Sequence, residues 1–344
     1  METTRKWGVA VNELLDVRDL TVAFQSKDKS KSLIPALDSV TFTIKRGETL
    51  GLVGESGCGK TLSSLAVMGL LPESARVQSG QLVFDGEDLL ALKAAEHNKV
   101  RGVRIGMIFQ DPMTSLSPYY TIGNQLMEGM RYHLAMTKRQ AKERGIELLR
   151  RVGIPEPERV FTDYPAQLSG GMRQRVMIAI AISCEPDLLI ADEPTTALDV
   201  TTQAQILELL GDLQREKGMS LVLISHDLGV IAEMCQRVVV MYAGQVIEQA
   251  ESKALFASPT HPYTRALLAA TPRLSSKQER FYSIPGSVPA PTEWGTGCRF
   301  RSRCEQATDT CGEMPPLSRM DGQRYVRCWY APDLQSTLPK EVRA

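Results

Sequence analysis

One eight-residue stretch constrains the fold of this chain more than any other. Residues 54–61 read Gly-Glu-Ser-Gly-Cys-Gly-Lys-Thr and match the pattern G-x-x-x-x-G-K-[ST] at every fixed position. Residues 49–53 before it have the pattern of a buried strand, and residues 62–68 after it are helical in character until Gly69 and Pro72. A strand, a glycine loop and a helix in this order direct backbone N–H groups and a helix N-terminus at a phosphate. The stretch therefore predicts nucleotide binding.

Individual residues of this loop have different expected roles. The backbone N–H groups cradle a triphosphate, Lys60 contacts its β- and γ-phosphates, and the Thr61 hydroxyl holds Mg²⁺. A glycine-rich turn with an unrelated lysine is the alternative, and the flanking strand and helix argue against it. The predicted nucleotide-binding residues of the loop are Gly54, Glu55, Ser56, Gly57, Cys58, Gly59, Lys60 and Thr61.

Composition excludes several other classes of protein. A length of 344 residues predicts about two domains, and 43% hydrophobic with 23% charged residues is ordinary for a globular protein. Lys+Arg and Asp+Glu are both 40, so nothing predicts a nucleic-acid surface. No apolar run approaches the ~18 residues that cross a bilayer, and residues 1–10 lack the apolar core of a signal peptide. We therefore expect a soluble, cytosolic chain.

Apolar strand patterns alternate with helical patterns through the first 250 residues. Such alternation predicts an α/β fold in which helices cover a parallel sheet. Helical periodicity dominates between residues 111 and 170, and past residue 250 the chain becomes rich in Pro, Gly, Arg and Cys, which predicts a domain boundary. The predicted strands are 14–17, 20–24, 40–44, 80–86, 104–109, 188–191, 221–224, 238–241 and 246–248, with a hairpin turn at 242–245.

Two adjacent acidic residues follow the apolar strand at 188–191. The carboxyl ends of parallel strands are where open α/β folds bind ligands. We expect Asp192 to hold Mg²⁺ and Glu193 to take a proton from an attacking water, a role worth about 10²–10⁴-fold in rate. The alternative is an acidic cap for the segment that follows.

A second glycine-rich segment opens an apolar helix. Ser169, Gly170 and Gly171 combine backbone N–H groups, a hydroxyl and a helix dipole, and so predict a second anion site. An ordinary serine cap is the alternative. One nucleotide rarely needs two such sites, so the duplication indicates an ATP site shared between two chains.

Taken together, these segments resemble the ATPase subunit of an ABC transporter. Residues 168–174 resemble the signature motif of that family, Gln110 the Q-loop glutamine, residues 197–199 the D-loop and His226 the switch histidine. Phe24 stands where the family places an aromatic ring against adenine, with Phe in place of the commoner Tyr.

The resemblance implies a role for each matched residue, with ATP and Mg²⁺ as cofactors. The implied catalytic residues are Glu193, His226 and Gln110. The implied Mg²⁺ ligands are Thr61, Gln110 and Asp192. The residues implied to contact ATP outside the phosphate loop are Phe24, Gln110, Asp192, Ser169, Gly170, Gly171 and Asp199.

Further segments resemble the oligopeptide/dipeptide importer branch of the family. They are residues 109–116, Met172 within the signature, residues 260–264, 285–289 and 297–304. This resemblance implies an ATPase that powers import of di- and oligopeptides, with nickel, a metallophore or glutathione as alternative solutes. Segment 260–264 has no implied catalytic role, since His261 there can simply start a helix.

The implied fold is an ABC cassette over residues 1–250 and an oligopeptide-transporter-type extension over residues 251–344. The cassette has a parallel core sheet, an antiparallel β subdomain and a helical subdomain at about 111–170. The implied partners are a second ATPase subunit, two permease subunits and an extracytoplasmic solute-binding protein, with no nucleic acid. A heterodimer is favoured over a homodimer, and the place of action is the cytoplasmic face of the cell membrane.

Two other classes within the same family are weighed against this one. A soluble ABC ATPase of repair or translation usually carries a long coiled coil or two cassettes in one chain, and neither pattern is present. A non-catalytic regulatory cassette lacks the residues equivalent to Glu193 or His226, and both are present here.

The seven cysteines are unevenly distributed. Cys58, Cys184 and Cys235 are scattered, whereas four crowd the last fifth of the chain: Cys298, Cys304, Cys311 and Cys328. In a cytosolic protein such a group predicts a metal site rather than disulfides.

The spacing of these four cysteines bears on which metal they bind. Intervening lengths of five, six and sixteen residues differ from the C-x₂₋₄-C pairs of zinc sites and favour a larger [4Fe–4S] cluster, with Zn²⁺ as the alternative. The importer branch implies the same cluster, and its expected role is structural because the tail has few apolar residues. The neighbouring arginines are expected to offset thiolate charge or to form a solvated face: Arg299, Arg301, Arg303, Arg324 and Arg327.

Overall fold

The computed structural model describes residues 12–25, 33–196, 198–270, 283–320 and 322–331. The segment on which the signal-peptide prediction rests lies outside the described residues, and so does Ala197 of the predicted D-loop. The chain divides into two compact units. The first falls within residues 1–44, 49–90 and 225–344, and the second consists of residues 45–48 and 91–224.

The first unit contains a four-stranded sheet in the order β2-β1-β4-β5. Strand β1 pairs antiparallel with β4, and β4 pairs antiparallel with β5, which confirms the predicted antiparallel subdomain. Its strands are β1 (Glu13–Phe24), β2 (Ile34–Lys45), β4 (Ala75–Phe84) and β5 (Glu87–Asp88).

Strand β1 corrects the sequence analysis, which placed two short strands where one long strand runs. Asp19 has a φ of +46°, and the register against β4 shifts between Arg18 and Thr21. A bulge of this kind bends a strand without ending it. On the partner strand, Gly80 makes the close approach possible, because a Cβ there would lie 2.7 Å from the carbonyl oxygens of Arg18 and Asp19. Strand β4 likewise begins earlier than predicted.

The first unit also contributes five neighbouring strands in the order β11-β12-β10-β9-β3. Strand β3 (Thr49–Val53) is parallel to β9 (Arg237–Tyr242), and β10 (Gln245–Glu251) is antiparallel to β9. The predicted hairpin between β9 and β10 is confirmed. Ala243 and Gly244 have φ angles of +43° and +78°, the left-handed pair that a tight two-residue turn requires.

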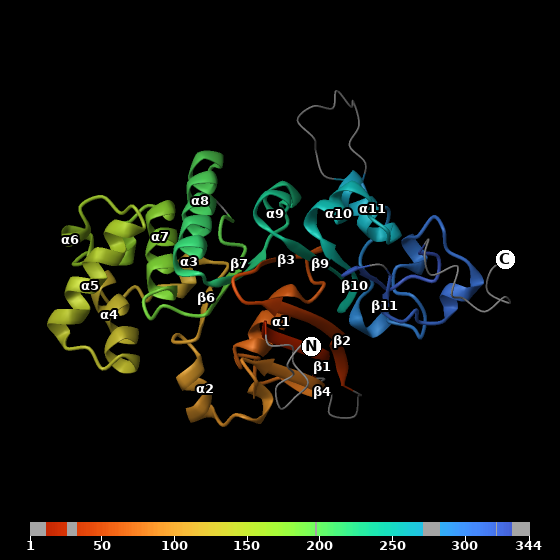
Figure 1. The fold of residues 1–344 in the computed structure, drawn as a ribbon, viewed down its shortest axis with the longest axis horizontal. Coiled ribbons are helices and arrows are strands. Elements are labelled where there is room, and N and C mark those ends of the chain that lie inside the picture. Colours follow the sequence, from red (N-terminus) through yellow and green to blue (C-terminus); the bar gives the residue numbers. More distant parts are fainter. Residues whose placement is uncertain (1–11, 26–32, 197, 271–282, 321, 332–344) are drawn as a thin grey trace. The chain divides into compact units, whose positions relative to one another are not determined.

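The C-terminal extension joins this same group of strands. Strand β12 (Tyr325–Val326) pairs antiparallel with β10, and β11 (Ser318–Arg319) pairs with β12. These segments lie beside β10 at the blue end of the chain (Figure 1). The other elements of the extension are α10 (Ser252–Ala257), α11 (Pro262–Ala269), η3 (Pro291–Glu293), η4 (Arg301–Arg303) and η5 (Asp309–Gly312).

The apolar residues of the extension pack on the cassette strands of the first unit. Phe300 is 3% exposed, and its ring lies 5.3 Å from that of Tyr242 in β9 and 5.4 Å from that of Tyr263 in α11. We expected a tail with too few apolar residues for a core. The extension instead shares a core with β9, so its folding does not rest on metal binding alone.

The second unit has three parallel strands in the order β8-β7-β6. All residues of these strands are buried, as expected for parallel strands covered on both faces. Helices α4, α5 and α7 pack against one another beside them (Figure 1). The elements are α2 (Ala94–Val100), β6 (Ile105–Ile108), α3 (Pro112–Ser115), α4 (Ile122–His133), α5 (Lys138–Arg151), α6 (Pro157–Val160), η2 (Pro165–Gln167), α7 (Gly170–Ala181), β7 (Leu188–Asp192), α8 (Val200–Lys217) and β8 (Ser220–Ile224).

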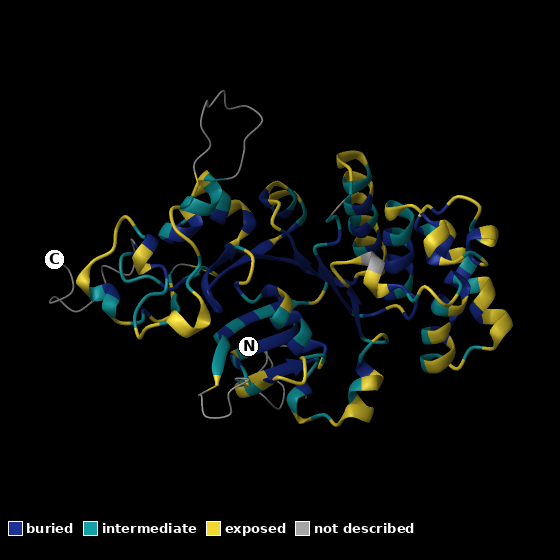
Figure 2. Ribbon diagram, turned by 180° about the vertical axis from the view of Figure 1, so that it is seen from behind, coloured by how far each residue is buried: buried dark blue, intermediate teal, exposed yellow. Residues whose placement is uncertain are grey.

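Local sequence signals explain where several of these helices begin and end. The Thr137 hydroxyl accepts the Gln140 N–H to start α5, and Asp199 accepts the Thr202 N–H to start α8. Helix α8 ends at Gly218 in the left-handed conformation that glycine favours. Strands β3 and β9 of the first unit and the three parallel strands of the second are buried throughout, while helices of both units have exposed residues (Figure 2). Of the helices that can be described, none has the length and apolar character needed to cross a membrane.

Candidate active site

The phosphate-binding loop links β3 to α1 (Lys60–Val67) in the first unit. Gly54, Gly57 and Gly59 all have positive φ angles, at +147°, +78° and +106°. A Cβ on Gly54 would lie 2.2 Å from the Met241 carbonyl oxygen, so only glycine fits there. Helix α1 begins at Lys60, two residues earlier than predicted, because Gly59 serves as its N-cap. The first turn of the helix therefore faces the loop, as phosphate binding requires.

Lys60 is buried in the centre of this loop. Its Nζ atom donates hydrogen bonds to the carbonyl oxygens of Gly54 at 2.7 Å and Glu55 at 3.2 Å, and lies 3.7 Å from Cys58 Sγ. Burial raises the pKa of the Cys58 thiol even though the Lys60 charge lowers it. The ammonium group is thus held where the loop carbonyls converge, next to the backbone N–H groups that would face a phosphate.

The predicted acidic pair ends β7 in the second unit. Asp192 is 1% exposed and is the last residue of that strand. Glu193 has a φ of +48°, a left-handed conformation that is costly for a non-glycine residue and that recurs at functional sites. Its backbone N–H donates to the Ile224 carbonyl at 3.0 Å. The chain therefore leaves the extended conformation of β7 at Glu193.

Gln110 and Glu193 are 83 residues apart and form a direct hydrogen bond. Gln110 Nε2 donates to Glu193 Oε2 at 2.7 Å, and the Thr196 hydroxyl donates to the same oxygen at 3.1 Å. Strands β6 and β7 are adjacent and parallel, so Gln110 and Glu193 both lie just past the same ends of neighbouring strands. The structure therefore joins the predicted Q-loop glutamine to the predicted general base.

The second predicted anion site begins α7. The Ser169 hydroxyl accepts the Met172 N–H at 3.3 Å, so the expected N-cap is present, and Ser169 and Gly170 are exposed. A Cβ on Gly171 would lie 2.9 Å from the Thr202 side chain in α8. Asp199 caps α8, and hydrogen bonds from Thr202 lower the pKa of its carboxyl group. Signature and D-loop residues thus start two helices that touch at their first turns.

Two further predicted residues belong to the first unit. His226 is exposed and lies two residues beyond the end of β8 at Ile224. Phe24 is the last residue of β1, paired with Ala75 and half-buried. Their predicted contacts with phosphate and adenine stay predictions.

Sequence reasoning missed two residues that contact the phosphate-binding loop from the C-terminal extension. The Tyr263 hydroxyl accepts the Glu55 backbone N–H at 2.9 Å, and Arg303 pairs with the Glu55 carboxylate at 2.9 Å. His261 caps α11 through its Nδ1 atom, which confirms the helix start expected there. Segments 260–264 and 297–304, which contain these two residues, are singled out by their resemblance to the importer branch. That resemblance does not indicate that they contact the phosphate-binding loop.

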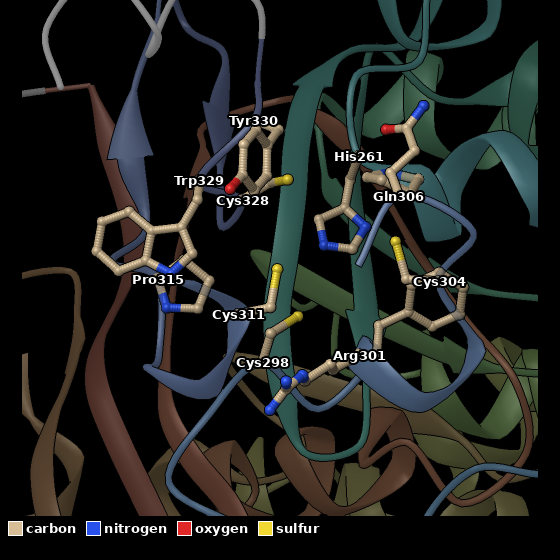
Figure 3. Close-up of a pocket in the computed structure, with 12 residues that line it drawn as sticks. His261, Cys298, Arg301, Cys304, Gln306, Cys311, Pro315, Cys328, Trp329 and Tyr330 are labelled. Atoms are coloured by element: carbon tan, nitrogen blue, oxygen red, sulfur yellow. The ribbon is translucent and has the colours of Figure 1, made fainter. Parts of the chain in front are cut away.

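Four cysteines of the extension line one pocket. Figure 3 shows the sulfur atoms turned toward a common space, with the ring of His261 at its edge. The Cys298 N–H donates to the Cys311 carbonyl at 2.9 Å, and a Cβ on Gly297 would lie 2.5 Å from that oxygen. Residue 297 must therefore be glycine for these two loops to meet. The cysteines present are Cys298, Cys304, Cys311 and Cys328.

The electrostatics of this pocket disfavour thiolates unless a cation is bound. Burial and the charges of the other three cysteines raise the pKa of Cys328 to about 11. Burial and its cysteine neighbours also raise the pKa of Cys298 and of Cys304. A bound metal centre would reverse these shifts. In the part of the chain that the structure describes, no three His, Cys, Asp or Glu side chains are arranged to hold a single metal ion.

Three of the five arginines named above bind groups other than the thiols, whereas Arg301 lines the cysteine pocket. Arg299 pairs with Asp38 and lies 3.6 Å from the Trp294 ring centroid, and Arg303 pairs with Glu55. Arg327 donates to the carbonyl oxygens of Val246 and Pro315. Each follows or precedes a pocket cysteine by one residue, yet each binds carbonyl or carboxylate groups of its own. Adjacent side chains diverge because neighbouring residues in an extended or turn backbone point in different directions.

The fold and these residues define an ABC-type ATPase. The family model described as ABC transporter matches residues 37–196. A solved dimeric ATP-binding cassette in a post-hydrolysis state, bound to ADP and Pi, superimposes with a TM-score of 0.62 at 29% identity, covering 69% of this chain and 98% of that one.

A second family model, described as the C-terminal region of oligopeptide/dipeptide transporters, matches residues 247–311. The dipeptide transport ATP-binding protein DppD of Escherichia coli is 49% identical over 321 residues, which is 93% of this chain and 97% of that protein. A probable peptide ABC transporter ATP-binding protein of Sinorhizobium fredii is 51% identical, over 92% and 94% of the two chains. This chain belongs to the family of ATP-binding subunits of dipeptide and oligopeptide ABC transporters.

Proposed function

We propose that this chain hydrolyses ATP to power the import of di- and oligopeptides through a multi-subunit ABC importer. The observation that carries the proposal is the hydrogen bond from Gln110 to Glu193, because it joins the predicted Q-loop glutamine to the predicted general base. The similarity to peptide-transport relatives spans both the cassette and the extension, which supports the choice of solute.

Each predicted site residue has its own role in this proposal. Lys60 neutralises the β- and γ-phosphates, while Thr61, Gln110 and Asp192 hold Mg²⁺, which lowers the charge on the reacting phosphate. Glu193 takes the proton of the attacking water. His226 acts with it as the second catalytic side chain, and Phe24 stacks on adenine.

The signature residues act on the ATP bound by a partner cassette. Ser169, Gly170 and Gly171 are exposed or half-buried at the start of α7, and Asp199 is exposed at the start of α8. An exposed helix N-terminus is a site for an anion supplied from outside. We propose a head-to-tail pair of cassettes, formed with a related second ATPase subunit.

Two permease subunits and an extracytoplasmic solute-binding protein complete the proposed importer, and the chain acts at the cytoplasmic face of the membrane. In this proposal residues 1–250 form the cassette, with its helical subdomain at about 111–170, and residues 251–344 form the extension. Nickel, a metallophore or glutathione are the alternative solutes, because solute selection falls to other subunits.

We further propose that the cysteine pocket holds a [4Fe–4S] cluster, with Zn²⁺ as the alternative. Four converging thiols are the donor set that binds such a cluster. Their thiolate forms repel one another, and a bound cation would offset this repulsion. The wide, irregular spacing of the four cysteines favours a larger centre over zinc. When bound, the cluster would cross-link the loops that carry its cysteines.

Transport by reconstituted importer tests the function. The chain, its second ATPase subunit and its permeases are placed in proteoliposomes with the solute-binding protein, and uptake of labelled dipeptide, Ni²⁺ and glutathione is compared. We expect ATP-dependent dipeptide uptake that Lys60→Ala abolishes, since a bound triphosphate then loses its main side-chain cation. Uptake of Ni²⁺ or glutathione alone would replace the peptide by another solute, and uptake unaffected by Lys60→Ala would overturn the ATPase role.

A further inference from the structure

Glu55 of the phosphate-binding loop is held at two points by the C-terminal extension. Its carboxylate accepts hydrogen bonds from Arg303, Nη1 to Oε1 at 2.9 Å and Nη2 to Oε2 at 3.2 Å. Its backbone N–H donates to the Tyr263 hydroxyl at 2.9 Å. Residues more than 200 positions away thus fix both the side chain and the backbone of one loop residue.

The guanidinium group of Arg303 is locked in place. Only 4% of its side chain is exposed, and besides Glu55 it donates to the Pro285 carbonyl at 2.8 Å and the Tyr242 hydroxyl at 3.2 Å. A bidentate pair of this kind specifies orientation as well as charge. Because removing one partner would leave a buried charge uncompensated, the pair has little freedom to separate.

Glu55 connects this pair directly to Lys60 of the phosphate-binding loop. Its carbonyl oxygen accepts hydrogen bonds from Lys60 Nζ at 3.2 Å and from the Cys58 N–H at 3.2 Å. Shifting Glu55 would therefore shift a hydrogen-bond partner of Lys60. The path from Arg303 to Lys60 has one intermediate residue.

Arg303 does not line the cysteine pocket itself, but it lies in η4 between Arg301 and Cys304, which both line it. Helix η4 lies between two pocket cysteines: the Arg301 N–H donates to the Cys298 carbonyl at 3.0 Å, and the Cys304 N–H donates to the Arg301 carbonyl at 3.3 Å. The turn that presents Cys304 to the pocket in Figure 3 presents Arg303 to Glu55. A rearrangement of this turn would move both side chains together.

We propose that Arg303 is a positioning residue that holds the phosphate-binding loop through Glu55 and couples nucleotide affinity to the order of the cysteine pocket. The inference rests on the proposed ATP binding, and it holds for any occupant of the pocket. By thermodynamic reciprocity, nucleotide binding must then stabilise the pocket to the same degree that the pocket strengthens nucleotide binding.

Nucleotide affinity of the full-length chain tests the first half of this proposal. Calorimetry with Mg²⁺ and a non-hydrolysable ATP analogue is run on Arg303→Lys, which keeps the charge but loses the fork, and on Glu55→Gln. We expect each to bind about tenfold more weakly than the unmodified chain, and the double variant to bind no more weakly than either single one, because the two changes remove one interaction.

Arg319→Lys is the matched control for these variants. Arg319 is an exposed residue of β11 in the same extension, donates to the Gly322 carbonyl at 3.0 Å, and does not line the cysteine pocket. We expect the nucleotide affinity of this control to be unchanged. Equal affinity of Arg303→Lys and the unmodified chain, or an equal loss in Arg319→Lys, would overturn the inference. An unmodified chain that binds no nucleotide would instead overturn the proposed function.

Alkylation of Cys304 tests the reciprocal half, and its first comparison, with and without nucleotide, uses the unmodified chain. Iodoacetamide labelling of the full-length chain without metal is followed by mass spectrometry of its peptides, with Cys184 in the second unit as the internal reference. We expect the nucleotide analogue to slow labelling of Cys304 several-fold relative to Cys184, and this protection to disappear in Arg303→Lys. Protection that persists in Arg303→Lys would contradict the coupling.

Discussion

Gln110 and Glu193 form a hydrogen bond of 2.7 Å between side chains that lie beyond the ends of neighbouring parallel strands. The amide N–H of Gln110 orients a carboxylate that the chain holds in a left-handed turn at φ +48°. A base in a fixed orientation loses less free energy in reaching the geometry of proton transfer.

Glu193→Gln should retain nucleotide binding and lose most turnover. The amide has the shape of the carboxylate but cannot accept the proton of water, so a loss of about 10²–10⁴-fold in ATPase rate is expected. Phosphate release in a steady-state assay, with affinity measured in parallel, checks this. Turnover within a few-fold of the unmodified chain would rule out Glu193 as the base.

Gln110→Ala should lower turnover by about tenfold while leaving the Glu193 carboxylate in place. The expected loss is smaller because the substitution removes an orienting hydrogen bond and not the base, and one hydrogen bond to a charged group is worth about 1.5–3 kcal/mol. The ATPase rate of this variant is compared with that of Thr196→Val, which removes the second donor to the same oxygen. A Gln110→Ala loss as large as that of Glu193→Gln would mean that the proposed Mg²⁺ contact of Gln110 matters more than its hydrogen bond to Glu193.

Ser169→Arg should act on the partner subunit and not on its own nucleotide. The Ser169 hydroxyl is exposed at the start of α7, so a bulky cation there blocks a facing site but spares the folded unit. Mixing Ser169→Arg with Glu193→Gln gives one site with both defects and one with neither, if this chain pairs with itself. Recovery of ATPase activity on mixing would establish self-pairing, whereas no recovery would favour a distinct partner chain.

Protein purified without oxygen should contain about four iron and four sulfide ions per chain. Cys328→Ser removes a thiol from the pocket and should lower the iron content sharply, while Cys184→Ser, which lies outside the pocket, should leave it unchanged. Metal analysis and the visible absorption spectrum are the measurements. Stoichiometric zinc without iron would replace the cluster by the alternative ion.

Cys58 should resist alkylation in the folded protein at neutral pH. Burial raises the pKa of its thiol, and the neighbouring Lys60 charge offsets only part of this effect. The reactive thiolate is therefore depleted at neutral pH and grows only as pH rises toward the raised pKa. Peptide mass spectrometry after iodoacetamide treatment at pH 7 to 9 checks this. Rapid labelling of the native protein at pH 7 would contradict this prediction. It would show that the loop opens, or that the Lys60 charge lowers the pKa of the Cys58 thiol more than burial raises it.

Local pattern predicted many of the elements because their causes are local. The buried strand before Gly54, the acidic pair after β7 and the hairpin at Ala243 and Gly244 each follow from a run of apolar residues or from a backbone conformation that few residue types adopt. The continuous β1 strand could not be predicted in this way, because the bulge at Asp19 depends on the close approach of Gly80 from another strand.

The sequence by itself determined the chemistry: a phosphate loop, an acidic pair, a second anion site and four grouped cysteines, all recognisable because residue type and spacing suffice to state them. Tertiary structure alone decided which of these groups meet. The bonds from Gln110 to Glu193 and from Arg303 to Glu55 join positions 83 and 248 residues apart. No periodicity encodes such pairs, since they arise from strand order and from packing of the extension on β9. The partners of Arg299, Arg303 and Arg327 could not be predicted from the sequence for a similar reason. Residues that are adjacent in the chain can direct their side chains to different partners.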